Sequence, residues 1–139
     1  MCFIPSKADN VEENVSLPVG EMEFNLLLQY KDQEVTAICV MEVQEDKSVV
    51  GTIVNEFGIK VFDFTYSNGK ANILNVLGPL NKWYIRRVIR GDFTFLLKNM
   101  PLHHDVRQKR RCLYFLEDNE IKCVNEKYKI SYTLTPMIR

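Results

Sequence analysis

The alternation of apolar and polar side chains with a period of two constrains the fold of this chain more than any other feature. Over residues 24–30 every second side chain is large and apolar, as expected of a strand whose successive side chains point to opposite faces of a sheet. The pattern recurs along the chain and predicts about eight strands, over residues 24–30, 35–43, 49–55, 60–66, 71–77, 111–116, 121–125 and 128–134.

The dipeptide Asn68-Gly69 predicts the best-defined turn. A type I′ hairpin needs two central residues with positive φ, and Asn-Gly tolerates this conformation best. With these two residues as the loop, Phe64 pairs with Ile73 across the hairpin, and apolar side chains share one face of both strands.

Helical spacing replaces the alternation over residues 80–97, where apolar side chains recur at Leu80, Tyr84 and Val88. Gly91 interrupts this segment and Pro101 ends it, which predicts a kinked or two-piece helix. Because the apolar stripe of a helix must be buried, we expect it to lie on the apolar sheet face. The predicted fold is therefore mainly β (α+β), a curved antiparallel sheet or open half-barrel of about eight strands covered by one kinked helical insert.

The chain of 139 residues has the length of one domain, with 46% hydrophobic and 26% charged residues. Residues 7–16 are mostly Asp, Glu, Asn, Ser and Lys and lack apolar periodicity. We therefore predict a flexible N-terminal tether at residues 1–20 and a single β-rich domain at residues 21–139. The apolar runs are far shorter than the roughly 20 residues that cross a bilayer.

The charge of the chain is balanced, since 18 basic and 18 acidic residues leave no net charge. This balance disfavours nucleic acid as a partner and leaves local recognition as the source of any electrostatic binding. No glycine-rich phosphate loop, no Gly-x-Ser-x-Gly elbow and no CxxC pair occurs in the sequence. We therefore predict a protein that is not an enzyme and that holds no cofactor and no metal.

Two short motifs carry little weight. His103-His104-Asp105 contains both histidines of the chain, but adjacent side chains in an extended segment point in opposite directions, so a shared metal would need a special loop geometry. Arg90-Gly91-Asp92 matches a cell-adhesion tripeptide, but it joins the two predicted helical pieces and we assign it no role.

Three cysteines, Cys39, Cys112 and Cys123, fall in predicted strands, where a buried thiol is common. If the turn between the last two is centred on Asp118-Asn119, Cys112 and Cys123 project from the same face of adjacent strands. This arrangement permits a disulfide but does not require one.

The helical segment carries two candidate binding features. The first is a basic stripe that consists of Lys82, Arg86, Arg87 and Arg90. It either contacts anionic headgroups or an acidic partner, or it is simply a solvated helix face. Between helix and curved sheet there is either a packed core or an apolar hollow that suits an acyl chain. The predicted hollow is lined by Phe62, Phe64, Ile73, Tyr84, Val88, Phe93, Leu96 and Tyr132. In the second case the helix is a lid, with Gly91 as its hinge.

The stretches VGTIVNEFGIKVFDF (residues 50–64) and KWYIRRVI (residues 82–89) resemble small lipoproteins of Bacteroides-type bacteria. More remotely, the layout of residues 21–134 resembles the lipoprotein localisation carriers and receptors. Those are open β half-barrels whose concave apolar face, covered by helices, receives lipoprotein acyl chains. The resemblance implies a lipid-anchored protein on the periplasmic face of the bacterial outer membrane, with Cys2 as the site of lipid attachment and the following polar segment as its tether.

Two functional hypotheses from different classes result. The first is an envelope lipoprotein that binds a lipid acyl chain or a lipidated protein in the hollow of its half-barrel. The alternative is a non-enzymatic structural or protein-interaction module of the cell envelope that uses its basic helix face. A filled core would favour the alternative.

Overall fold

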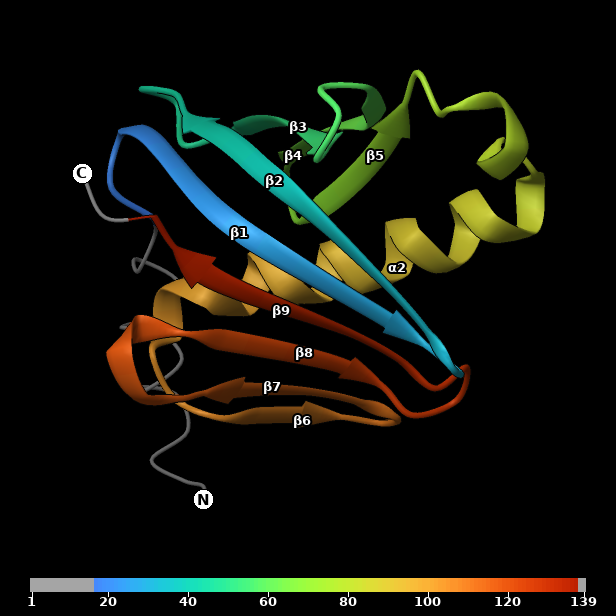
Figure 1. Cartoon of the computed structure of the whole chain (residues 1–139). Coiled ribbons are helices and arrows are strands. Elements are labelled where there is room, and N and C mark those ends of the chain that lie inside the picture. The colour runs from blue at the N-terminus through green and yellow to red at the C-terminus, as the bar shows by residue number, and fades with distance from the viewer. Residues whose placement is uncertain (1–16, 138–139) are drawn as a thin grey trace.

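The computed structural model describes residues 17–137 and shows one curved, open antiparallel sheet with a single long helix (Figure 1). The strands are β1 (Gly20–Tyr30), β2 (Gln33–Val43), β3 (Val49–Asn55), β4 (Lys60–Ser67), β5 (Lys70–Leu74), β6 (Val106–Gln108), β7 (Arg111–Phe115), β8 (Ile121–Asn125) and β9 (Ile130–Pro136). The helix is α2 (Trp83–Asn99), and three 3-10 turns accompany it, η1 (Gly78–Leu80), η2 (Met100–Leu102) and η3 (Glu117–Asn119). The mainly β, half-barrel-like fold predicted from the sequence is confirmed.

The strand order is β5-β4-β3-β2-β1-β9-β8-β7-β6, so two meanders meet where β1 pairs with β9. The helix α2 follows one edge strand, β5, and precedes the other, β6. Its 17 residues rise about 25 Å, whereas nine strands laid flat span roughly 38 Å. The helix connects the two edges because the sheet curves around it, and α2 therefore lies across the concave face (Figure 1).

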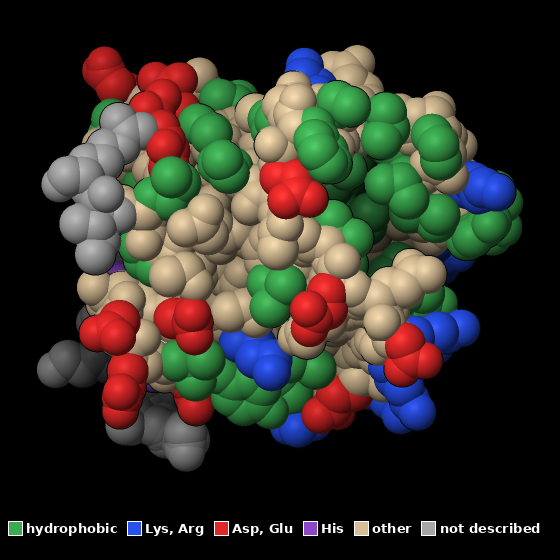
Figure 2. Space-filling view, in the orientation of Figure 1, with side chains coloured by type: hydrophobic (Ala, Val, Ile, Leu, Met, Phe, Trp, Pro, Cys, Tyr) green, Lys and Arg blue, Asp and Glu red, His purple; other side chains and the backbone are tan. Residues whose placement is uncertain are grey.

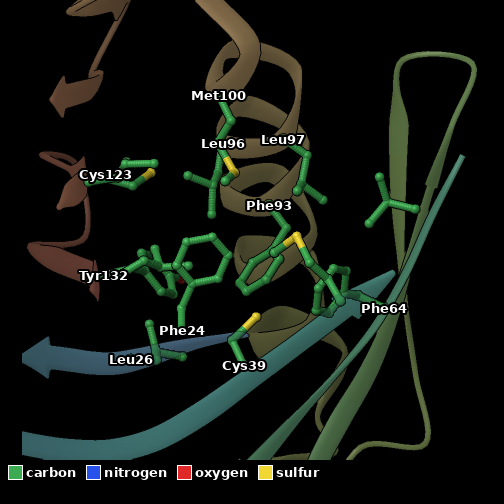
Figure 3. Close-up of a cluster of buried hydrophobic side chains, with 14 of the residues drawn as sticks. Phe24, Leu26, Cys39, Phe64, Phe93, Leu96, Leu97, Met100, Cys123 and Tyr132 are labelled. Atoms are coloured by element: carbon green, nitrogen blue, oxygen red, sulfur yellow. The ribbon is translucent and has the colours of Figure 1, made fainter. Parts of the chain in front are cut away.

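The core lies between α2 and the concave face of the sheet. Phe93 is at its centre, with ring centroids 5.5 Å from Phe62, 5.0 Å from Phe64 and 5.7 Å from Tyr132. Figure 3 shows Phe93 and Leu96 pointing from the helix toward the sheet side chains. Phe62, Phe64 and Tyr132 come from both meanders, so this helix turn joins the two halves of the sheet.

The predicted hairpin is confirmed residue by residue. Phe64 pairs with Ile73 and Tyr66 with Ala71. Asn68 and Gly69 adopt φ values of 53° and 76°, as a type I′ turn requires.

Gly51 of β3 lies directly beneath the ring of its cross-strand partner Phe64. A Cβ at this position would lie 2.2 Å from Phe64 Cζ, so the ring would have to move. We expect Gly51→Ala to lower the free energy of unfolding by about 1–3 kcal/mol through overpacking. Urea denaturation measures this, with Gly78→Ala as the control because a Cβ there meets no atom within 4 Å. An equal effect of both substitutions would contradict this packing.

The predicted break of the helix at Gly91 is wrong, because α2 runs without interruption from Trp83 to Asn99. A Cβ on Gly91 would lie 2.4 Å from Nη2 of Arg111, which passes over the helix at this point. Glycine is needed at this position because the Arg111 side chain approaches the helix closely. The helix has no break at Gly91 that could act as the hinge of a lid. The helix also begins three residues later than predicted, since Leu80 belongs to η1.

Several strand assignments also need correction. The strand predicted over residues 71–77 already ends at Leu74. The segment before Arg111, predicted as a loop, contains a short additional strand, β6, which raises the number of strands to nine. Cys112 and Cys123 lie on opposite faces, because Cys112 pairs with Val124 and Cys123 with Leu113. Their turn closes with Leu116 N–H donating to the Glu120 carbonyl, so its centre is Asp118 and the register differs by one residue.

The thiols of Cys39, Cys112 and Cys123 are buried and free. Burial raises the pKa of Cys39 to about 12 and also raises that of Cys123, so both remain protonated and unreactive at neutral pH. Cys2 and most of the predicted tether lie outside the described residues, but Leu17, assigned to the tether, packs in the core.

Candidate functional site

The two halves of α2 have different environments. All of its buried residues lie in the C-terminal half, after Gly91: Asp92, Phe93, Phe95, Leu96, Leu97 and Asn99. The N-terminal half is exposed or half-buried, with Trp83 65% and Tyr84 51% exposed. The helix thus covers the sheet with one half and presents the other half to solvent beside β5.

The residues of the predicted apolar hollow separate into two groups. Phe62, Phe64, Phe93, Leu96 and Tyr132 are buried and pack against one another. Ile73 and Val88 are half-buried at the rim, while Tyr84 is exposed. Side chains of α2 occupy the concave face at this point (Figure 3), so an acyl chain would have to displace Phe93 or its neighbours.

The exposed half of α2 forms a basic stripe next to the free edge of β5. Trp83, Arg86, Arg87 and Arg90 follow the i, i+3, i+4, i+7 spacing that brings side chains to one helix face. Together with Asn72 and Ile73 of β5, they line a surface hollow of about 270 Å³. The hollow combines three guanidinium groups with an aromatic wall.

In the part of the chain that the structure describes, the arginines of this stripe have no carboxylate partner. Arg86 donates to the side-chain oxygen of Asn81, and within residues 17–137 neither Arg87 nor Arg90 forms an ion pair. Lys82, the remaining predicted contact residue, is exposed immediately before the first helical residue. The structure therefore brings Arg86, Arg87 and Arg90 together, and no carboxylate among residues 17–137 pairs with them.

An exposed apolar patch continues from the stripe at the same end of the sheet. Large side chains in it are at least one-third exposed: Phe57, Ile59, Leu74, Leu77, Trp83 and Tyr84. Phe57 is 80% exposed on the β3–β4 turn. In Figure 2 apolar side chains gather at the upper right, over this turn and over the chain between β5 and α2. We call this patch and the basic stripe together the docking face.

Local hydrogen bonds hold the docking face in place. The Asn55 side-chain oxygen accepts the backbone N–H groups of Phe57 and Ile59, both at 2.9 Å. The Leu77 N–H donates to the Val61 carbonyl at 2.8 Å, which ties the segment after β5 to β4. These exposed apolar residues are therefore on structured turns.

A second hollow, of about 460 Å³, lies on the outer face of β8 and β9. Its lining mixes Lys31, Lys122 and Lys129 with Glu126. Glu126 already accepts two hydrogen bonds from Arg107, at 3.1 and 3.0 Å. Because its charges are of both signs and Glu126 is already paired with Arg107, this hollow is a weaker candidate for an electrostatic partner than the docking face.

A buried polar cluster, which was not predicted from the sequence, joins α2 to the second meander, strands β6 to β9. Asp92, with a fully buried side chain, accepts hydrogen bonds from Arg111 at 2.9 Å, Asn125 at 2.8 Å and Tyr132 at 2.6 Å. Burial, and secondarily the Asp92 carboxylate, raise the pKa of Tyr132 well above its usual value. Every partner of Asp92 is a donor, so the cluster holds the helix in position and leaves no group free for acid–base chemistry.

The sequence signal for this cluster is an aspartate within the apolar stripe of the helix, immediately before Phe93. The three residues of the Arg90-Gly91-Asp92 tripeptide accordingly have different environments: the arginine is exposed, the glycine lies under Arg111, and the aspartate is buried. It presents no linear recognition motif.

Among residues 17–137, no group of three His, Cys, Asp or Glu side chains is placed to hold a metal ion. None of the helices in this part of the chain combines the length and the hydrophobicity that a membrane span requires. No protein-family model matches the chain. No curated protein shows significant sequence similarity to it.

Proposed function

We propose that the protein is a non-enzymatic module of the cell envelope that binds an anionic membrane surface through its docking face. The observation that carries this proposal is that the exposed apolar patch and the basic stripe lie at the same end of the sheet. Trp and Tyr prefer the boundary between lipid headgroups and acyl chains, and each Lys or Arg near an anionic surface contributes about 1 kcal/mol.

The arrangement of the docking face matches what an interfacial site needs. Phe57 and Trp83 project enough apolar surface to enter the acyl boundary, while Arg87 and Arg90 remain at headgroup depth. The neutral net charge of the chain makes this concentration of positive charge a local feature. Surface binding also leaves the packed core intact, whereas acyl-chain uptake between α2 and the sheet would disrupt it.

The lipid anchor at Cys2 and the outer-membrane location are expectations that come from the resemblance to small lipoproteins. They fit the proposal because a lipid anchor would keep the docking face close to the same membrane surface. A protein partner with an acidic surface is the alternative occupant of the same face.

The single tryptophan of the chain, Trp83, makes the proposal directly testable. We expect its fluorescence to shift to shorter wavelength when vesicles rich in phosphatidylglycerol are added, and the shift to weaken as salt increases. Vesicles of phosphatidylcholine alone should give little shift. Arg87→Glu with Arg90→Glu should weaken binding on the order of thirtyfold or more, because two favourable charges become unfavourable.

The matched control is Arg110→Glu with Lys122→Glu, which changes the net charge equally but on the other meander. We expect this control to bind like the parent protein. If both double variants bind equally well, or if the parent protein ignores anionic vesicles, membrane docking by this face is wrong. In the second case, loss of binding to an acidic protein on charge reversal would favour the alternative.

A further inference from the structure

We infer that the hollow between β5 and α2 binds one terminal phosphate group, a phosphate monoester carried by a membrane lipid. This inference rests on the proposed function and names the headgroup that the docking face recognises. The hollow, of about 270 Å³, has room for a headgroup, and four of its six lining residues are polar or charged, beside Ile73 and Trp83. Acyl chains would remain outside, against the exposed apolar patch.

The free edge of β5 supplies the floor of the hollow. In a two-residue hairpin, Ser67 and Lys70 form the first hydrogen-bonded pair, so Ala71 and Ile73 direct their backbone N–H groups away from β4. The Ala71 N–H is taken by the Thr94 hydroxyl of α2 at 3.0 Å. Ile73 is the next outward-facing position, and it lines the hollow.

The helix supplies the wall and the charge. Arg86, Arg87 and Arg90 line the hollow from one face of α2, with Trp83 one turn before them. A guanidinium group presents a planar fork of donors that matches the oxygens of a phosphate, and paired N–H donors add geometric specificity. Asp63, an acidic residue nearby in β4, is already bonded to Lys60 and Asn75, at 3.1 and 2.7 Å. The hollow therefore concentrates donors and positive charge.

Several donors from different directions favour a terminal phosphate over other anions. A phosphate monoester carries about −1.5 to −2 charges and three acceptor oxygens, whereas a carboxylate has two oxygens and one charge. A diester has two free oxygens and one charge. Three arginines, the Asn72 amide and an edge N–H can therefore engage a monoester more completely.

An extended acidic peptide pairing with β5 is the competing occupant of this edge. Strand addition needs a run of free backbone groups, but β5 spans only Lys70–Leu74 and Thr94 already occupies the Ala71 N–H. Only Ile73 remains within the strand as an outward-facing position. The geometry thus favours a compact anion.

The test compares vesicles of phosphatidic acid, phosphatidylglycerol and phosphatidylserine that are matched in zeta potential, with Trp83 fluorescence as the readout. We expect phosphatidic acid to be preferred about tenfold over the other two. In Arg86→Lys with Arg90→Lys, which keeps the charge but removes the forks, the ratio of the affinities should fall toward one. Glycerol 3-phosphate should compete with phosphatidic acid vesicles more effectively than glycerol or acetate does.

The outcomes separate the two proposals. Equal binding to all three anionic vesicles would overturn phosphate recognition and leave membrane docking standing. Absence of vesicle binding would overturn the proposed function, and phosphate recognition would then survive only if glycerol 3-phosphate still perturbs Trp83 in the parent protein and not in the arginine-to-lysine variant. Displacement of the phosphate by an acidic peptide that forms new backbone hydrogen bonds to Ile73 would overturn the inference in favour of strand addition.

Discussion

Replacing Phe93 by alanine is expected to lower the free energy of unfolding by about 3–5 kcal/mol. The ring is buried and contacts Phe62, Phe64 and Tyr132, which come from both meanders. Its removal leaves a cavity between the helix and the sheet that the surrounding strands are too constrained to fill. Chemical denaturation of the parent and the variant measures the change.

Phe57→Ala is the matched control, because it removes the same side chain from a position that is 80% exposed. Its effect on unfolding should stay within about 0.5 kcal/mol, since little apolar surface is lost from the core. Vesicle binding, in contrast, should be weakened more by Phe57→Ala than by Phe93→Ala. A Phe93→Ala variant as stable as Phe57→Ala would show that α2 does not pack on the concave face as described.

The strand pattern could be predicted where a local turn fixes the register. Asn68 and Gly69 determine the pairing of β4 with β5, because both must adopt positive φ and few residues do so easily. The turn at Asp118 has no such dipeptide. Both Asp118 and Asn119 adopt positive φ there, the loop contains an odd number of residues, and the predicted register was wrong by one position.

The helix shows the second limit of sequence reasoning. A glycine inside a helical pattern indicates either a break or the close approach of another group, and the two have the same local signature. Which one applies at Gly91 depends on Arg111, which is 20 positions away in the sequence. Only the folded sheet brings Arg111 next to the helix. Similarly, β6 has three residues and is too short to show an alternation.

The candidate site could be predicted in part. The spacing of Arg86, Arg87 and Arg90 assigned them to one helix face, and the structure places them together. The apolar patch was missed, because Phe57 and Leu77 lie in different connections and come to the same end of the sheet only in the folded protein. Whether the apolar residues facing the helix form a hollow or a core depends on side-chain volumes in three dimensions.

Arg111→Met is expected to lower the free energy of unfolding by about 3 kcal/mol, because it leaves the Asp92 carboxylate buried without its counter-ion. The lower end of the usual range applies, since the Arg111 side chain is 35% exposed and solvent weakens the pair. Asn125 and Tyr132 would still donate to Asp92, but neither carries a positive charge at neutral pH.

A double-mutant cycle separates the charge from the packing in this cluster. If the penalty of Arg111→Met comes from an unpaired buried carboxylate, then Asp92→Asn in the same chain should restore part of the lost stability, because both charges are gone while the side-chain oxygen can still accept a hydrogen bond from Asn125. Lost packing of the Arg111 guanidinium group on Gly91 would instead persist in the double variant. Arg107→Met, which breaks the exposed pair with Glu126, is the control and should change stability by about 1 kcal/mol or less. Equal effects of Arg111→Met and Arg107→Met would mean that the Asp92 cluster does not hold α2 on the second meander, and the anchoring of the helix would then rest on Phe93 and its apolar neighbours alone.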